Sequence, residues 1–300
     1  MLAGKVKETL LKWNTPRRIV QFLSFILFSA MIFNITAMPL LFPVLWTWGY
    51  QPNTVGDAFT AIQLAFYSAA FPWLAFASFL IAGVLIGKAM CGWVCPFGFI
   101  QDLLVFVKNE KREFSLRTHD TLIKAKYAVL GIAFFISITF AITKVMAVSG
   151  NYESGLGIFV KVPFTAVSPA ETLFGTLPTL IQDIRFGVLS DILALPALFW
   201  AQLVIMIIVL ALAIYVPRGW CRYLCPHGAI MAIMNHFSFI GLRRDPVKCA
   251  KGGCRLCVQV CPTRVPILEL PWQKFSDSEC IYCMKCVDAC KDKAIKPTYP

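Results

Sequence analysis

The sequence predicts an α-helical integral membrane protein with four transmembrane helices, arranged as a duplicated two-helix unit, followed by a small cysteine-rich α+β domain. The first observation is composition: 58% of the 300 residues are hydrophobic and only 15% are charged, which is too apolar for a soluble protein of this length. The second is segregation, because residues 1–243 contain four long uncharged stretches whereas residues 244–300 are rich in lysine, aspartate and cysteine. The third is a C-x3-C-P motif that occurs twice within residues 1–243, about 130 residues apart.

The first predicted span covers residues 19–42, which carry no charge and are long enough to cross a hydrocarbon core of about 30 Å as a helix. Residues 1–18 hold five basic side chains and one acidic side chain. Because the apolar stretch is far longer than the core of a cleavable signal peptide, we expect a membrane anchor that stays in place. After a connection rich in proline, tryptophan and glycine, residues 61–87 form the second predicted span.

The first C-x3-C-P motif, at residues 91–96, follows the second span, and the other, at residues 221–226, follows the fourth. The third and fourth spans are predicted at residues 127–143 and 192–216, joined by a long apolar connection. Proline after the second cysteine disfavours helical geometry for that cysteine and suits the first turn of a new helix. Each motif is therefore predicted to be a corner at which one helix ends and another begins.

The two copies of helix, helix and corner cover residues 17–110 and 122–243, and both begin and end on the same side of the membrane. Of 28 lysines and arginines, 25 fall in the N-terminal region, the middle loop and the tail, while Lys144, Lys161 and Arg185 fall on the other side. By the positive-inside rule we expect a multi-pass protein of the cytoplasmic (inner) membrane with both termini in the cytoplasm. The net charge of +12 then faces anionic membrane lipid, and no interleaving of basic and aromatic residues indicates nucleic acid.

The tail holds eight cysteines in two groups of four, and the second group has the spacing C-x2-C-x2-C-x3-C. This pattern resembles that of bacterial ferredoxins with two [4Fe–4S] clusters, in which three thiolates of one run and one of the other ligate each cluster. The resemblance implies a bacterial-ferredoxin-like fold for residues 244–300. It assigns Cys249, Cys254, Cys257 and Cys290 to one cluster and Cys261, Cys280, Cys283 and Cys286 to the other.

Two features of the tail depart from the ferredoxin pattern. The first run has four residues between Cys249 and Cys254 instead of two, and Lys291 stands where the ferredoxins usually have proline. A pair of zinc sites or a disulfide knot would also use eight cysteines. Structural zinc prefers two C-x2-C pairs separated by a longer insert, so the spacing favours iron–sulfur clusters.

The two corners supply four more thiolates: Cys91, Cys95, Cys221 and Cys225. If the duplication makes the two copies pseudo-twofold related, these thiolates converge on one axis. They would then give the full complement for a third iron–sulfur cluster. A redox-active dithiol pair, a bound copper or zinc ion, or reduced cysteines that cap the corners would suit the same motif.

The segments CGWVCPFG and RGWCRYLCPHG, followed by the double cysteine run, resemble the NapH-type membrane iron–sulfur proteins, which are quinol dehydrogenase subunits. The resemblance covers nearly the whole chain. Two related types, regulators of nitrous-oxide reductase and oxidase-assembly proteins, carry an additional flavin-binding or immunoglobulin-like part and are expected to match less well. The resemblance implies an electron-transfer subunit that passes electrons between the quinol/quinone pool and a partner redox protein or subunit, with quinone as substrate.

A physical check favours electron transfer over ion pumping, because the interiors of the four predicted spans hold no Asp, Glu, Lys, Arg or His. Gln63 and Gln202 are expected to serve helix contacts. We expect the quinone headgroup near the inner surface, around Trp93, Arg222 and His227. Two other functions fit the same motifs: a copper reductase or maturation factor that binds metal at the corners, and a sensor of the redox state of the quinone pool.

Overall fold

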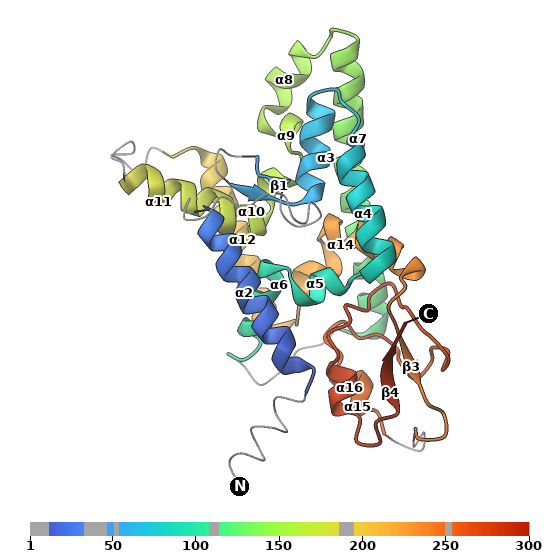
Figure 1. The fold of residues 1–300 in the computed structure, drawn as a ribbon. Helices are drawn as coiled ribbons and strands as arrows, with labels where there is room; N and C mark the ends of the chain where they lie inside the picture. The colour runs from blue at the N-terminus through green and yellow to red at the C-terminus, as the bar shows by residue number, and fades with distance from the viewer. Residues whose placement is uncertain are drawn as a thin grey trace. The chain divides into compact units, whose positions relative to one another are not determined.

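A computed structural model describes residues 12–32, 47–50, 54–107, 114–185, 195–249 and 254–299, most of which are helical (Figure 1). The α-helices are α2 (Asn14–Ile32), α3 (Ala58–Tyr67), α4 (Trp73–Ile86), α5 (Ala89–Trp93), α6 (Pro96–Leu104), α7 (Leu116–Val145), α8 (Gly150–Leu156), α9 (Ile158–Lys161), α10 (Pro169–Glu171), α11 (Leu177–Arg185), α12 (Ala197–Tyr215), α13 (Gly219–Tyr223), α14 (Pro226–Met234), α15 (Leu256–Gln259) and α16 (Lys285–Ala289). The strands are β1 (Thr47–Trp48), β2 (Val55–Gly56), β3 (Gly241–Arg244) and β4 (Ile295–Thr298). Two 3-10 turns, Thr165–Val167 and Asn235–Phe237, and a π-helical turn, Thr172–Thr176, complete the described elements.

The chain divides into two compact units. Unit 1 comprises Met1–Phe25, Leu80–Asp102 and Ile230–Pro300, and unit 2 comprises Ile26–Phe79 and Leu103–Ala229. The cysteine-rich tail therefore belongs to the same unit as the first corner, whereas the second corner belongs to unit 2. The boundary predicted at residue 243 between a membrane domain and a tail domain stays a prediction.

Two helices of the described chain are long and apolar enough to cross a membrane. They are Arg117–Val145, with a mean hydropathy of 2.1, and Ala197–Tyr215, with a mean hydropathy of 2.7. These correspond to the third and fourth predicted spans. The helix α7 begins well before residue 127, at a start capped by Ser115, whose hydroxyl accepts a hydrogen bond from the Thr118 amide.

The other two predicted spans are not shown as spans. The helix α2 contains the beginning of the first one, and residues 33–42 lie outside the described residues. The second prediction is wrong, because residues 61–87 do not form one helix. Helix α3 ends at Tyr67, Ala69 adopts a left-handed conformation with φ of 55°, and α4 begins only after Pro72. Helices of 10 and 14 residues are each shorter than the roughly 20 residues that a span needs.

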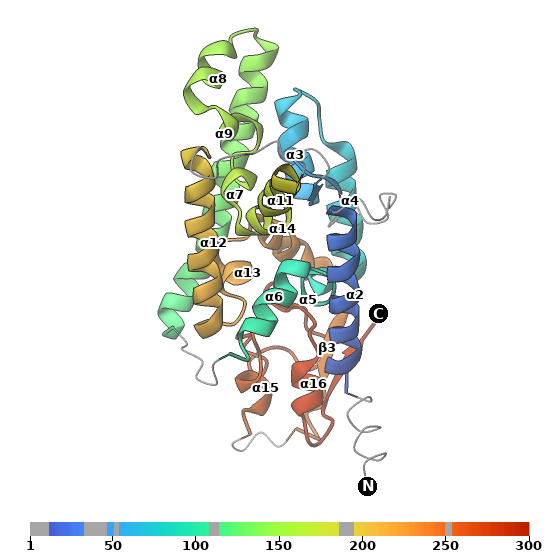
Figure 2. The same ribbon diagram turned by 90° about the vertical axis from the view of Figure 1, so that its left-hand side faces the viewer.

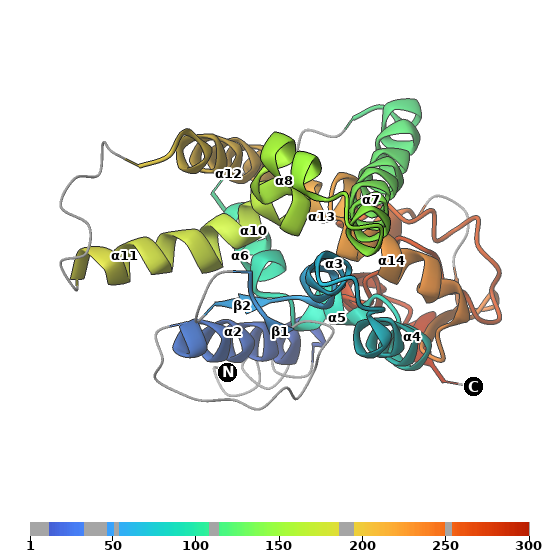
Figure 3. The ribbon, with the colours of Figure 1, turned by 90° about the horizontal axis from the view of Figure 1, so that it is seen from above.

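In unit 2 the long helix α7 packs against α3 and α9. Figure 3 shows α3 beside α7, and Figures 1 and 2 show α9 near α7. Two glutamines join helices to the segment around residues 164–166. Gln63 of α3 accepts a hydrogen bond from the Phe164 amide at 3.0 Å, and Gln202 of α12 donates one to the Ala166 carbonyl at 2.6 Å. Both glutamines therefore make packing contacts, as expected from the sequence.

In unit 1 the tail is an α+β fold. The strands β3 and β4 pair antiparallel, with Gly241 opposite Thr298 and Arg244 opposite Ile295, and the short helices α15 and α16 pack together (Figures 1 and 2). The core beneath them consists of apolar side chains that are at most 3% exposed, namely Leu242, Val265, Ile267, Phe275, Tyr282 and Ile295. Strand β3 begins at residue 241, so the α+β fold starts slightly before the predicted residue 244.

Polar contacts tie the tail to other parts of unit 1. The carboxylate of Asp288 in α16 accepts hydrogen bonds from the amides of Trp13 and Asn14, both at 2.9 Å, at the N-terminus of α2. A carboxylate at this position is favourable because it meets the unpaired amides and the positive end of the helix dipole. Lys88, only 2% exposed, forms a buried ion pair of 2.9 Å with Glu279.

Candidate metal centres and a buried carboxyl pair

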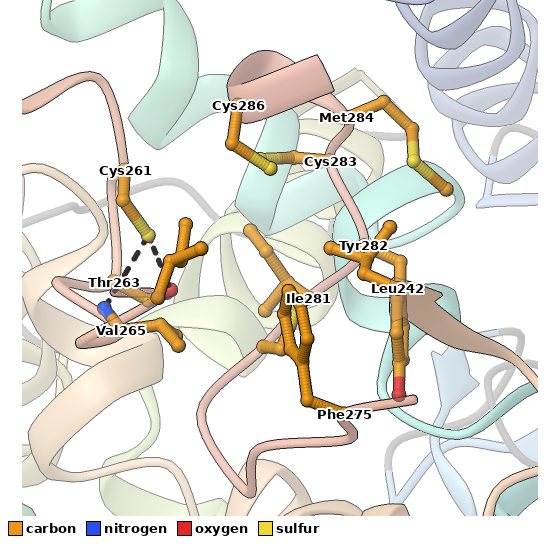
Figure 4. A pocket seen from close by; sticks show the side chains of 12 residues that line it. Leu242, Cys261, Thr263, Val265, Phe275, Ile281, Tyr282, Cys283, Met284 and Cys286 are labelled. Carbon is orange, nitrogen blue, oxygen red and sulfur yellow. Dashed lines mark hydrogen bonds between the residues drawn. The ribbon is translucent and has the colours of Figure 1, made fainter. Parts of the chain in front are cut away.

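Four of the eight tail cysteines line one pocket in unit 1 (Figure 4): Cys261, Cys280, Cys283 and Cys286. The first comes from one cysteine run and the other three from the second. Apolar side chains complete much of the lining, among them Leu242, Val265, Ile267 and Phe275. The pocket thus brings together the four thiols that the ferredoxin resemblance assigns to one cluster.

The chemistry of these thiols depends on their burial. Burial raises the pKa of Cys280 and of Cys286 well above the ordinary value, and the charges of the neighbouring thiolates raise it further. Burial also raises the pKa of Cys261, and the charge of Cys283 adds to that effect. Thiols with raised pKa values are thiolates together only beside positive charge, which the iron of a cluster supplies. The donor set and its apolar surroundings therefore fit a [4Fe–4S] cluster.

A cluster and a single ion need different arrangements of ligands. Among the described residues, no three His, Cys, Asp or Glu side chains gather closely enough to hold one metal ion. The thiolates of a [4Fe–4S] cluster stand wider apart, since each of the four binds a different iron. In Figure 4, Cys261 lies on one side of the pocket while Cys283 and Cys286 lie on the other.

The remaining tail cysteines form a second group. Burial raises the pKa of Cys257, and the charges of Cys249 and Cys254 raise it as well, so these three thiols lie near one another. Cys290 is the fourth member assigned by resemblance. It directly follows α16, the helix that packs against α15, which carries Cys257.

The last cysteine of each run accepts the same backbone hydrogen bond. The amide of Val265 donates to Cys261 Sγ at 3.4 Å, and the amide of Ala294 donates to Cys290 Sγ at 3.3 Å. Both donors lie four residues after the cysteine. An amide that points at sulfur stabilises the thiolate form and is one of the means by which a protein tunes a cluster.

The backbone after these two cysteines is also the same. The residue three positions on is left-handed in both copies, with φ of 58° at Arg264 and 50° at Lys293. This similarity holds although Pro262 follows the first of these cysteines and Lys291 follows the second. The substitution of lysine for the usual proline therefore leaves the turn unchanged.

The C-x3-C-P motifs at residues 91–96 and 221–226 are the predicted corners between helices. Each begins with a five-residue helix, α5 or α13, and continues into a nine-residue helix that starts at the proline, α6 or α14. The amide of Cys95 donates to the Met90 carbonyl at 3.2 Å, and the amide of Cys225 donates to the Trp220 carbonyl at 3.0 Å. Cys91 and Cys95 lie in unit 1, whereas Cys221 and Cys225 lie in unit 2, so the convergence of the four stays a prediction.

The first corner is in close contact with the tail. A Cβ atom on Gly92 would lie 2.1 Å from the Ile281 carbonyl oxygen, so only glycine allows this approach. Next to it, Trp93 Nε1 donates a hydrogen bond to the Tyr282 carbonyl at 2.8 Å. The backbone between Cys280 and Cys283 therefore rests on the first corner.

The three residues predicted to contact a quinone have separate partners. Trp93 donates its indole hydrogen bond to the tail, at the Tyr282 carbonyl. Arg222, only 3% exposed, has its Nη2 atom 3.1 Å from His119 Nδ1. His227, 5% exposed, has its Nδ1 atom 3.0 Å from Asp57 Oδ2, and its ring packs edge-on against Phe79.

Sequence patterns did not identify Asp57 as a site residue. It caps α3, where its Oδ1 atom accepts hydrogen bonds from the Thr60 amide at 2.8 Å and the Thr60 hydroxyl at 2.9 Å. Burial alone would raise the pKa of Asp57, but the hydrogen bond and charge of His227, together with the bonds from Thr60, bring it below the ordinary value. Asp57, whose side chain is 35% exposed, is therefore the ionised member of the pair that it forms with His227.

Glu171 is a second carboxyl near Asp57 that sequence analysis missed. It is 7% exposed, and burial, followed by the negative charge of Asp57, raises its pKa to about 8. It lies outside the predicted spans, in the connection between the third and the fourth. An acidic residue in such a connection does not stand out in a hydropathy profile. The signal available was a single glutamate within an apolar stretch at residues 156–182.

Family models match both the segments that contain the corners and the cysteine-rich tail. A model described as a 4Fe-4S binding domain matches residues 69–112 and again residues 198–244, so each match contains one corner. A model described as a 4Fe-4S dicluster domain matches residues 241–291, which contain all eight tail cysteines.

Curated proteins align with most of the chain at low identity. The uncharacterized protein MJ0750 of Methanocaldococcus jannaschii is 26% identical over 73% of this chain and 76% of its own length. The putative electron transport protein YccM of Escherichia coli is 27% identical over 71% of this chain, and the ferredoxin-type protein NapH of Haemophilus influenzae is 27% identical over 72%. The alignments span 51% of YccM and 64% of NapH. No solved structure matches the chain.

Proposed function

We propose, since the chain is a distant member of the NapH- and YccM-type family of ferredoxin-type iron–sulfur proteins, that it passes electrons between the membrane quinol pool and a partner redox protein. The pocket lined by Cys261, Cys280, Cys283 and Cys286 carries this proposal most directly. A [4Fe–4S] cluster accepts and releases single electrons, so a chain with several clusters is suited to electron transfer.

The tail holds two clusters in this proposal. Cys261, Cys280, Cys283 and Cys286 ligate one of them, and Cys249, Cys254, Cys257 and Cys290 ligate the other. The pocket supports the first set, and the electrostatic influence of Cys249 and Cys254 on Cys257 supports three members of the second. The matching amide–sulfur bonds at Cys261 and Cys290 give these two cysteines the same role.

The corners hold a third cluster in the same proposal, ligated by Cys91, Cys95, Cys221 and Cys225. Two observations support it: the hydrogen-bonding pattern of the two corners is the same, and the 4Fe-4S binding model matches both of them. The dithiol, copper, zinc and capping alternatives use the same cysteines, and they predict a lower iron content.

The protein acts at the cytoplasmic membrane in this proposal, with both termini and the tail in the cytoplasm. The two long apolar helices and the similarity to NapH support a membrane location. The quinone headgroup binds in unit 2 near the second corner, where Arg222 and His227 are buried. Trp93 is no longer favoured as a quinone contact, because its indole N–H is bonded to the tail.

The test is anaerobic reduction of the purified protein by menadiol, followed by EPR. We expect about twelve irons per chain if three clusters are present, about eight if there are two, and repeated reduction by menadiol when an oxidised acceptor protein is supplied. Clusters that dithionite reduces and menadiol leaves oxidised would overturn the quinol proposal. Copper retained in place of corner iron would favour the metal reductase, and a single reduction without turnover would favour the redox sensor.

A further inference from the structure

Glu171 is an acid in an apolar part of unit 2. It ends α10, which packs against the membrane-length helix α12, and it is 93% buried. Among the described residues, none offers a hydrogen bond to its Oε1 atom. A buried polar atom without a partner costs about 1–3 kcal/mol, so its retention here indicates a function rather than a contribution to stability.

The backbone beside Glu171 makes room for its carboxyl group. A π-helical turn, Thr172–Thr176, follows directly, and a Cβ atom on Gly175 would lie 2.4 Å from Glu171 Oε1. Glycine at this position therefore leaves the space into which the carboxyl group folds. Such π turns inside helices occur frequently at functional sites.

The Asp57–His227 pair presents a second unpartnered atom. Nδ1 of His227 is bonded to Asp57, while no described residue bonds its buried Nε2 atom. Asp57 keeps 35% of its side-chain surface accessible although His227 and Glu171 are almost fully covered. The cluster therefore reaches the surface at Asp57 and contains two buried polar atoms, Glu171 Oε1 and His227 Nε2, that no described residue bonds.

The two carboxyl groups differ in protonation because their surroundings differ. Asp57, bonded to His227 and Thr60, is ionised, whereas burial and the charge of Asp57 raise the pKa of Glu171 to about 8. Pairs of carboxyls whose pKa values are pushed apart mark acid and base roles, and a group with a pKa near the working pH exchanges protons most efficiently.

Few other charged groups face Glu171. Asp57 comes from the start of α3, with His227 of α14 behind it, and Tyr50 comes from the end of β1, where burial and the charge of Glu171 raise the tyrosine pKa. The segment 165–167 and helix α12, which also pack against α10, contain no Asp, Glu, Lys, Arg or His. The protonation of Glu171 is therefore set mainly by its burial and by Asp57.

We propose that Glu171 accepts one of the protons that quinol oxidation releases. The Asp57–His227 pair beside it keeps the binding site of the quinol headgroup polar. This inference rests on the proposed function and names the residues of its quinol site. Oxidation of one hydroquinone to quinone breaks two O–H bonds and releases two protons and two electrons. The ionised carboxylate of Glu171 takes one proton, water takes the other, and the electrons leave one at a time to the oxidised iron–sulfur centres.

The test compares wild type with Glu171→Gln, which keeps the shape of the side chain and cannot ionise. The rate of cluster reduction by menadiol should rise in the wild type as the pH passes about 8, because the ionised fraction of Glu171 increases. In Glu171→Gln it should be about 100-fold lower and lack this inflection, and in Glu171→Asp the inflection should persist. Menadiol's own driving force changes with pH equally in all samples, so it cancels in the comparison.

A second measurement is independent of turnover. Infrared difference spectra of the resting protein should show a protonated carboxyl band that titrates near pH 8 and is absent in Glu171→Gln. Glu153→Gln, which alters an exposed carboxylate on α8, serves as the matched control and should leave the rate, pH profile and band unchanged.

The outcomes separate this inference from the proposed function. Equal rates and equal pH profiles in wild type and Glu171→Gln would overturn the inference and leave quinol oxidation standing. A wild-type protein that dithionite reduces but menadiol does not would overturn the proposed function itself. Loss of iron or of dithionite-reducible signal in Glu171→Gln would show a structural role and would also overturn the inference. Glu171→Asp, in which the pH inflection should persist, is the second variant that tests the inference.

Discussion

Gly92 and Arg222 occupy the same place in the two corners, one residue after the first cysteine. They make different contacts there. Gly92 has no side chain, which allows the Ile281 carbonyl to approach its backbone. Arg222 instead fills buried space with a guanidinium group that lies beside His119 and over the ring of Tyr223. Close contact with a second backbone is therefore possible at the first corner and is blocked by the arginine side chain at the other.

Replacing Gly92 by alanine should loosen the tail from the first corner. The added Cβ would meet the Ile281 oxygen at 2.1 Å, and overpacking of this kind costs about 1–3 kcal/mol. We expect a lower unfolding temperature and a changed EPR line shape of the cluster held by Cys280 and its partners. Gly131→Ala in α7 is the matched control, because a Cβ there meets nothing within 4 Å and alanine favours a helix by about 0.5–1 kcal/mol. An equal melting temperature in both variants would contradict the proposed contact.

The corners are the part of the fold that the sequence predicted best, and the second span is the part it predicted wrongly. Proline after a cysteine restricts the backbone locally, so the pattern identifies the corner without any knowledge of tertiary contacts. Hydropathy averages over a window, and residues 61–87 are apolar throughout although the chain turns at Ala69 and Pro72. The uncharged stretch indicated a preference for an apolar environment and carried little information about chain direction.

Glu171 and Asp57 escaped prediction for a related reason. Their significance depends on proximity between α3 and α10, which are more than 100 residues apart in the chain, and sequence spacing says nothing about such pairs. The tail cysteines were predictable because the ligands of a cluster come from short loops whose spacing reflects the cluster geometry.

Removing iron should unfold the tail while leaving the long apolar helices intact. The strands β3 and β4 have four residues each, α15 has four and α16 has five, so these elements gain little stability by themselves. Small domains with such limited cores usually depend on metal ligation for folding. Hydrogen exchange after anaerobic chelation should show loss of amide protection across residues 248–296 and retained protection in α7 and α12. Full protection of the tail in the iron-free protein would contradict this expectation.

Each compact unit contains one corner, and only unit 1 contains the tail. The amide–sulfur bonds, left-handed residues and short helices repeat within the tail, and the corners repeat between the units, so the chain carries two duplications of different size. A cluster shared by both corners would link the units covalently through iron. Such a linkage would make the assembly of the whole molecule dependent on all four corner cysteines.

The four corner cysteines should behave as one set. If Cys91, Cys95, Cys221 and Cys225 ligate one cluster, each single replacement by alanine should remove about four irons per chain and leave the EPR signals of the tail clusters in place. Cys91→Ala in unit 1 and Cys225→Ala in unit 2 should therefore give the same loss. Cys254→Ala provides the comparison, because it should weaken a tail signal and leave the corner cluster intact.

Two results would show that the corners act separately. One is a normal iron content in Cys91→Ala together with normal reduction by menadiol. The other is loss of iron in Cys225→Ala alone, since a shared cluster needs both corners equally. Either result would favour a dithiol or a transient metal site at the affected corner, because two thiolates suffice for those functions whereas a [4Fe–4S] cluster needs four ligands.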